Sequence, residues 1–221
     1  MTVLSGVVPP VVTPLTESFE VDYPSLTRVI ENLLDGGVHG LFVLGSSGEV
    51  VFHDDATRAR IIEHTMKVAG GRVPVLAGTI DPATERTIAN ARAAQSAGVD
   101  AVVVTAPFYA RTSQPEVGDH FRYVREALDI PVIAYDIPVC VNIKLERKTT
   151  VTLAREGVIA GLKDSSGDDG NFRLGLLELL LAQGLEEGLD LDLDAAFAPV
   201  VAGVSLGVLA DPLFGRARSR H

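Results

Sequence analysis

The sequence predicts an α/β protein in which residues 1–221 form a single (β/α)8 TIM barrel domain. Short apolar runs alternate with longer helix-like segments, and the runs begin roughly every 30 residues, which is the length of one βαβ unit. The count of such runs reaches eight. A composition of 47% hydrophobic and 22% charged residues is typical of a globular chain with one substantial core.

Six strands are expected from runs that are nearly continuous in apolar residues, as parallel strands covered on both faces usually are. These runs span residues 6–14, 40–45, 73–79, 101–107, 131–137 and 158–163. Six βα units fit either a doubly wound open sheet or an eight-stranded barrel. Residues 189–193 (LDLDL) and 204–212 (VSLGVLADP) supply two further runs, which favours the barrel. The seventh run fits least well, because charged residues alternate along it.

Helix signals lie between these runs. Asp22 is the expected N-cap of a helix that has Pro24 in its first turn and stops at Gly36. Residues 82–98 predict a second helix that closes at Gly98. Helical segments are also expected at 54–64 (DDATRARIIEH) and at 171–184 (NFRLGLLELLLAQG).

Charge and composition exclude several classes of partner and site. A formal net charge of −10 and a pI near 4.9 argue against nucleic acid or an anionic membrane as a partner. A single cysteine, Cys140, gives no intrachain disulfide, and the N-terminus lacks a signal-peptide pattern, so we expect a cytoplasmic protein. No histidine has metal-ligand spacing, so neither a metal nor another cofactor is expected. The histidines are His39, His53, His64, His120 and His221.

Lys163 ends an apolar run that reads as a buried strand (VIAGLK), an environment in which an ammonium group is costly. Active sites of this barrel gather at the carboxyl ends of the strands, so the residues that end each run are candidates. They are Thr13, Ser46, Ser47, Glu49, Tyr109, Tyr135 and Lys163.

These residue types indicate covalent amine catalysis. An amine held against apolar walls has a lowered pKa, so more of it is the neutral nucleophile that attacks a carbonyl. The phenol of Tyr135 is placed to shuttle protons. The loop GSSGE (45–49) precedes a helix, where backbone N–H groups and hydroxyls can hold a carboxylate. Together these features suit a 2-keto acid.

Four motifs, VVTPL, GSSGE, YDIP and GLKDSSGD, occur in an order that resembles the dihydrodipicolinate synthase / N-acetylneuraminate lyase family of class I aldolases. The resemblance covers roughly residues 5–175. It implies that Lys163 forms a Schiff base and that Tyr135 is the general acid/base. It also implies that Tyr109 relays protons in the site of a neighbouring subunit, so we expect a homo-oligomer, either a dimer or a tetramer.

The same resemblance assigns the remaining site residues. Ser46 and Ser47 take the carboxylate-binding positions, and Ser47 is also counted among the catalytic residues. Further predicted substrate-binding residues are Thr13, Gly45 and Val204.

Two departures from the family pattern shape the functional expectation. Cys140 stands where the synthases have an arginine for the second substrate's carboxylate, and a thiol cannot make that bidentate contact. The chain ends at LFGRARSRH, soon after the eighth expected strand, so we expect a barrel that lacks the eighth helix and the usual C-terminal helical extension.

Two function classes remain open. The first is a pyruvate-dependent aldolase or a keto-deoxy sugar acid aldolase or dehydratase, with 4-hydroxy-tetrahydrodipicolinate synthase as an alternative in the same class. The second is a catalytically silent barrel that binds ligands or assembles with partners.

Overall fold

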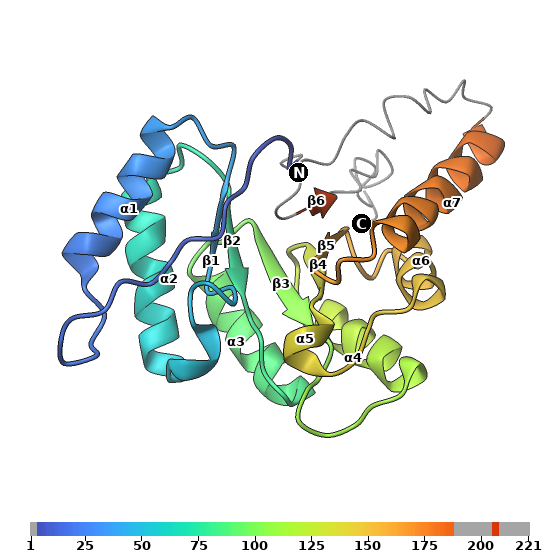
Figure 1. Cartoon of the computed structure of the whole chain (residues 1–221), viewed down its shortest axis with the longest axis horizontal. Coiled ribbons are helices and arrows are strands. Elements are labelled where there is room, and N and C mark those ends of the chain that lie inside the picture. The colour runs from blue at the N-terminus through green and yellow to red at the C-terminus, as the bar shows by residue number, and fades with distance from the viewer. Residues whose placement is uncertain (1–3, 188–204, 208–221) are drawn as a thin grey trace, which may run out of the picture.

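The architecture is a curved sheet with helices around its outer side, seen in a computed structural model that describes residues 4–187 and 205–207 (Figure 1). Five strands are parallel and follow one another in chain order, and a sixth strand is antiparallel to its neighbour β5. The strands are β1 (Leu41–Val43), β2 (Val75–Gly78), β3 (Ala101–Thr105), β4 (Val132–Asp136), β5 (Gly161–Asp164) and β6 (Ser205–Gly207). The described residues thus form a half-barrel.

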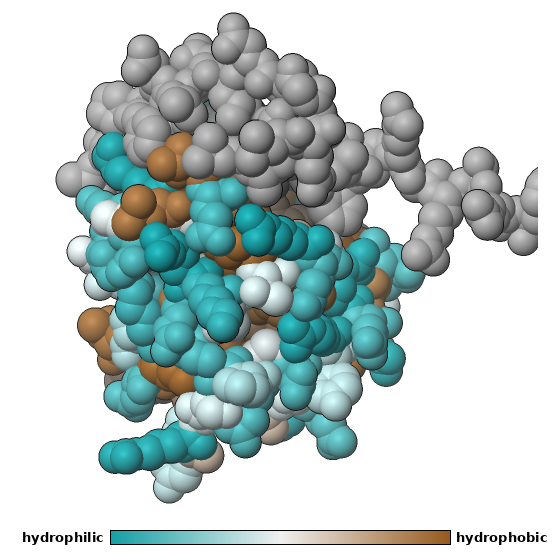
Figure 2. Space-filling model, turned by 90° about the vertical axis from the view of Figure 1, so that its right-hand side faces the viewer, coloured by the Kyte–Doolittle hydropathy of each residue, from teal (hydrophilic) through white to brown (hydrophobic). Residues whose placement is uncertain are grey.

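Helices connect these strands in alternation, and neighbouring helices pack against one another around the sheet. The helices are α1 (Tyr23–Asp35), α2 (Asp55–Ala69), α3 (Thr84–Ser96), α4 (Gln114–Glu126), α5 (Pro138–Val141), α6 (Arg147–Arg155) and α7 (Asp169–Glu187), with a 3₁₀ turn η1 (Val50–Phe52) before α2. The side on which α4, α6 and α7 lie is mostly hydrophilic over its described part (Figure 2). None of the described helices combines the length and the apolar character needed to cross a membrane.

Helix ends follow the expected local chemistry. Asp22 caps α1 by accepting a hydrogen bond from the Ser25 backbone N–H at 3.0 Å, and Gly36 is its C-cap. Helix α3 ends at Ser96, and Gly98 beyond it has φ +91°, a conformation that glycine adopts at little cost. The predicted helices around these residues are confirmed.

The core lies where the sequence predicts it, because β1 to β4 are buried along their whole length. One continuous hydrophobic cluster joins these strands to the inner faces of the helices. Burying both faces of a parallel sheet explains why the strand sequences are nearly uninterrupted apolar runs. The five predicted strands from 40–45 to 158–163 are confirmed.

The first predicted strand, residues 6–14, forms less regular structure than expected. It lies beside β1 through a single parallel bridge between Pro10 and Phe42. Val11 N–H donates to the Phe42 carbonyl at 2.8 Å, and Phe42 N–H donates to Pro9 O at 3.1 Å. Prolines lack the backbone N–H that a strand ladder requires, which limits the pairing to these bonds.

The C-terminal expectations are met only in part. Strand β6 falls within the predicted run 204–212, but it pairs antiparallel with β5, where Leu162 faces Gly207. The expectation of a parallel eighth strand is therefore wrong for these residues. An edge strand offers unpaired backbone groups that a strand of either direction satisfies. The predicted strand 189–193 and the region of the eighth helix lie outside the described residues.

Candidate active site

Lys163 on β5 and Tyr135 on β4 are direct partners in the parallel register, and Tyr135 is in turn the partner of Thr105 on β3. Register partners in neighbouring parallel strands point to the same face of the sheet. The lysine is 3% exposed and the tyrosine 4%. Both lie near the carboxyl ends of their strands, which is where active sites of this fold form.

The contacts of the Lys163 amine are aromatic rings and a hydroxyl. Nζ lies 3.5 Å from the centroid of the Tyr135 ring and 5.9 Å from that of Phe42, and it donates to Ser165 Oγ at 3.0 Å. The Phe42 and Tyr135 rings meet edge to face, with centroids 6.3 Å apart. Two aromatic side chains therefore form a wall beside the amine.

Burial lowers the pKa of Lys163 below its ordinary value, because removal from water disfavours the ammonium form. The Tyr135 phenol and the charge of Asp164 act in the opposite direction but are weaker causes. A larger fraction of the amine is therefore neutral than in an exposed lysine, as a nucleophile requires.

The loop Gly45–Glu49 follows β1 and lies beside this aromatic wall. Gly45 packs so closely on Phe42 that a Cβ at this position would lie 2.6 Å from the ring. Thr13 Oγ1 donates to the Gly48 carbonyl at 2.9 Å, which ties the N-terminal segment to the loop. Ser46 and Ser47 are exposed, so their hydroxyls are free to meet a ligand.

A close backbone approach fixes the start of this loop. A Cβ on Gly78, the last residue of β2, would overlap the carbonyl oxygen of Leu44, which itself has φ +54°. Only glycine allows the two main chains to come this near.

The described contacts of the Lys163 amine do not include Tyr109, the predicted proton relay of a neighbouring subunit's site. Tyr109 is 97% exposed on the loop after β3 and has φ +77°. Cys140 is exposed in α5. Val204 lies outside the described residues.

Two buried threonine hydroxyls were not singled out from the sequence. Thr79 directly follows β2, and Thr105 ends β3 beside Tyr135 in the register. Among the described residues neither Oγ1 has a hydrogen-bond partner. Buried hydroxyls rarely lack a hydrogen-bond partner. Their position at strand ends was the signal that could have identified them.

A partly buried ion pair braces the ends of β4 and β5. Lys144 Nζ lies 2.8 Å from Asp136 Oδ2 and 2.7 Å from Ser166 Oγ, and Leu145 N–H donates to Asp136 Oδ1 at 3.0 Å. Burial raises the pKa of Asp136, while Lys144 and the Leu145 N–H oppose this shift. The brace joins the segment after β4 to the segment after β5.

A cavity of ≈ 1050 Å³ lies elsewhere, between the loops and helices from α4 to α7. Charged side chains of both signs line it, and Arg147 and Glu178 across it are 4.0 Å apart. The lining of this cavity contains neither Lys163 nor Tyr135. The strand-end site is therefore identified by its side-chain chemistry and not by the size of a cavity. Over the described part of the chain, no group of three or more histidine, cysteine, aspartate or glutamate side chains could hold a metal ion.

Sequence comparison supplies the observation that decides the family. The profile of the Dihydrodipicolinate synthetase family matches residues 3–174. The chain belongs to this family. The match spans all five parallel strands and Lys163.

Relatives with curated sequences have two kinds of description. A DapA-like lyase of Halobacterium salinarum, described as uncharacterized, is 38% identical over 196 residues, covering 84% of this chain and 64% of the relative. A 4-hydroxy-tetrahydrodipicolinate synthase of Salinibacter ruber is 35% identical over 164 residues, covering 74% of this chain and 54% of the relative. The chain thus spans less than two thirds of the length of either relative.

Solved structures of the dihydrodipicolinate synthetase family share the fold. YagE, a prophage protein of Escherichia coli K12 solved in complex with pyruvate, has a TM-score of 0.79 and 31% identity, covering 82% of this chain and 61% of its own. The chloride-inhibited dihydrodipicolinate synthase of Acinetobacter baumannii, complexed with pyruvate, has a TM-score of 0.78 and 28% identity, covering 80% and 60%. The half-barrel therefore belongs to the (β/α)8 class.

Proposed function

We propose that this chain carries the reactive centre of a lyase that acts on 2-keto acids through a Schiff base on Lys163. The observation that carries the proposal is the buried amine, 3.5 Å from the Tyr135 ring centroid at the carboxyl end of β5. Two structural relatives hold pyruvate, the simplest 2-keto acid.

The chemistry follows from the groups present. Neutral Nζ attacks the C2 carbonyl to give a carbinolamine, which loses water to form an iminium. Breaking a bond at C3 then sends its electron pair into the iminium, which yields an enamine. Tyr135 gives and takes the protons that these steps move. Ser46, Ser47 and the Gly45 backbone hold the carboxylate, while Thr13 supports the loop through Gly48.

The partner aldehyde is a neutral, hydroxylated one in this proposal, so the reaction is an aldol cleavage or condensation, or a dehydration of a keto-deoxy sugar acid. Cys140 offers no cation where the synthases have an arginine. We expect little condensation of pyruvate with aspartate semialdehyde, measured by product formation in a coupled assay. Efficient condensation would favour 4-hydroxy-tetrahydrodipicolinate synthase activity, the description carried by several relatives.

Reductive trapping tests the Schiff base. Incubation with pyruvate and borohydride should give a stable adduct that peptide mass spectrometry maps to Lys163. Lys163→Ala should form none, whereas Lys67→Ala, which removes an exposed lysine of α2, should react like the wild-type chain. A folded wild-type chain that forms no adduct would support the silent, ligand-binding barrel instead.

We also propose a single-domain chain that assembles into a cytoplasmic homo-oligomer. The side chains of Tyr109, Phe52 and Val139 are largely exposed, and a subunit contact would remove them from water. Sedimentation velocity should detect a species larger than the monomer. A monomer at all concentrations would contradict this assembly.

A further inference from the structure

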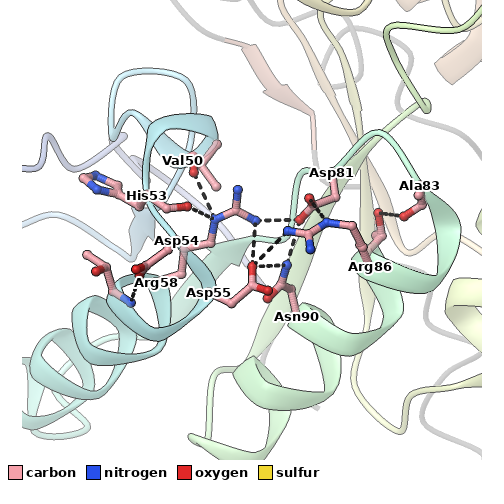
Figure 3. A network of polar contacts seen from close by, with 11 residues as sticks. Val50, His53, Asp54, Asp55, Arg58, Asp81, Ala83, Arg86 and Asn90 are labelled. Atoms are coloured by element: carbon pink, nitrogen blue, oxygen red, sulfur yellow. Dashed lines mark hydrogen bonds and ion pairs between the residues drawn. The ribbon is translucent and has the colours of Figure 1, made fainter.

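We propose that Arg58 is a positioning residue that holds the carboxylate-binding loop Gly45–Glu49 in place from the helix side. The effect on substrate affinity rests on the proposed function, whereas the effect on the loop does not. The observation behind it is a buried polar network that joins η1, α2 and α3 (Figure 3).

Arg58 lies on α2 and is 6% exposed. Its Nε donates to two main-chain carbonyls, Val50 O and His53 O, each at 3.0 Å. These carbonyls lie at the start of the η1 turn and just after its end. One guanidinium therefore closes the turn that directly follows the loop.

The same turn is hydrogen-bonded to the loop. Val50 N–H donates to Gly45 O at 3.4 Å, and Gly48 N–H donates to the same carbonyl at 3.0 Å. Gly45 in turn packs on the Phe42 ring, whose centroid is 5.9 Å from Lys163 Nζ. Bonds and packing thus run without interruption from Arg58 to the wall of the site.

Asp81 fixes the other end of the guanidinium. Its carboxylate is 3% exposed, and Oδ2 accepts from Arg58 Nη1 at 2.5 Å. Asn90 of α3 donates to Oδ2 at 2.7 Å, and Arg86 Nε donates to Oδ1 at 3.0 Å. The carboxylate has three donors, so its position is set by α3 as well as by the turn after β2.

The fork geometry of arginine is needed for this arrangement. Nη1 meets the carboxylate while Nε meets the two carbonyls, because the donors of a guanidinium point in fixed, different directions. A lysine at residue 58 keeps the charge and can pair with Asp81, but its single ammonium cannot also satisfy both carbonyls. Arg58→Lys therefore keeps the ion pair with Asp81 but removes the hydrogen bonds to the carbonyls that support the loop.

The experiment compares Arg58→Lys with the wild-type chain and with Arg72→Lys. Arg72 is a matched control, because it also joins a carboxylate, that of Glu31, to main-chain carbonyls, those of Val68 and Ala69, away from the loop. Circular dichroism establishes that all three chains are folded. Two readouts follow: hydrogen exchange of the amides over residues 45–53, and the pyruvate concentration that half-saturates borohydride trapping at Lys163.

For Arg58→Lys we expect faster exchange confined to residues 45–53 and a half-saturating concentration raised about 10- to 100-fold, in line with the cost of small misplacements in active sites. The pH dependence of trapping should stay unchanged, because Lys163 is not altered. Arg72→Lys should match the wild type in both readouts.

Unchanged exchange over residues 45–53 in Arg58→Lys would overturn the proposal, as would faster exchange with an unchanged half-saturating concentration. If the wild-type chain forms no adduct with pyruvate, the proposed function fails, and hydrogen exchange alone then decides whether Arg58 holds the loop.

Discussion

Burial in the sheet favours the neutral form of Lys163. The amine is buried against the Tyr135 and Phe42 rings, and its hydrogen bond goes to the uncharged hydroxyl of Ser165. The face of an aromatic ring attracts a cation, so the two rings still stabilise the charged form of the amine in part. The net direction is a lowered pKa, because burial outweighs these attractions.

The pH dependence of trapping should report this lowered pKa. The rate of adduct formation should rise with pH as Lys163 loses its proton, and it should level off once the amine is neutral. Because the folded-state pKa is lowered, the midpoint should fall below 10.5, the ordinary value for lysine. Trapping rates at saturating pyruvate across a pH series provide the measurement. A midpoint at or above 10.5 would mean that the amine is not desolvated in solution.

Tyr135→Phe should separate ring packing from proton transfer. Phenylalanine keeps the aromatic face 3.5 Å from Nζ but removes the hydroxyl, so pyruvate should still occupy the site. Turnover should fall by about 10²- to 10⁴-fold, the usual contribution of a positioned acid or base. Steady-state kinetics measure the fall. Retention of full turnover would remove Tyr135 from the acid/base role.

Strand-end positions could be read from the sequence, but the groups that support them could not. The apolar runs already placed Lys163 and Tyr135 near the ends of adjacent parallel strands, and the observed register makes them direct partners. Two ion pairs, Arg58 with Asp81 and Lys144 with Asp136, depend on how the helices and loops pack on the sheet. No periodicity in the chain encodes such contacts.

Helix α4 packs on the sheet with a histidine in its buried face. His120 is 2% exposed, and its Nδ1 lies 2.9 Å from Thr84 Oγ1 of α3. Its ring meets that of Phe121 edge to face at 5.4 Å. Burial lowers the pKa of His120 from 6.5 to about 4, because the imidazolium would have to form away from water.

Acid should therefore destabilise the packing of α4 around His120. The unfolded chain takes up the proton near pH 6.5 and the folded chain only near pH 4, so stability is lost as the pH falls through this window. A shift of this size corresponds to roughly 3 kcal/mol. Urea unfolding of the wild-type chain and His120→Gln between pH 7 and pH 4 provides the measurement. The variant should start less stable but lose less on acidification, and equal losses would exclude His120 as the cause.

Elements with strong periodic signals were predicted correctly, and those that depend on pairing partners were not. The apolar runs of β1 to β5 mark buried or half-buried strands, and caps such as Asp22 mark helix ends. The segment around Pro10 has the same apolar character, but proline restricts its hydrogen bonding to a bridge. The direction of β6 is a long-range choice that its own residues do not specify.

At the scale of the molecule, the described residues share one core. The cluster runs from Leu4 to Ile159 and includes residues of β1 to β4 and of the helices outside them. Because no boundary divides this cluster, the strands and helices should unfold together. We expect thermal unfolding followed by near- and far-ultraviolet circular dichroism to give coincident, single transitions. Two separated transitions would contradict a single domain.

Strand order in the sheet follows chain order from β1 to β5. Each βα unit therefore places its own candidate side chains at the same carboxyl edge of the sheet. The unit with β5 brings the amine, the unit with β4 brings the phenol, and the loop after β1 brings the serines. Cys140 belongs to a separate connection, in α5, whose replacement leaves the strands untouched. In the proposed lyase, a change in this one connection can therefore alter the preference for the partner aldehyde, while the groups that perform the Schiff-base chemistry stay the same.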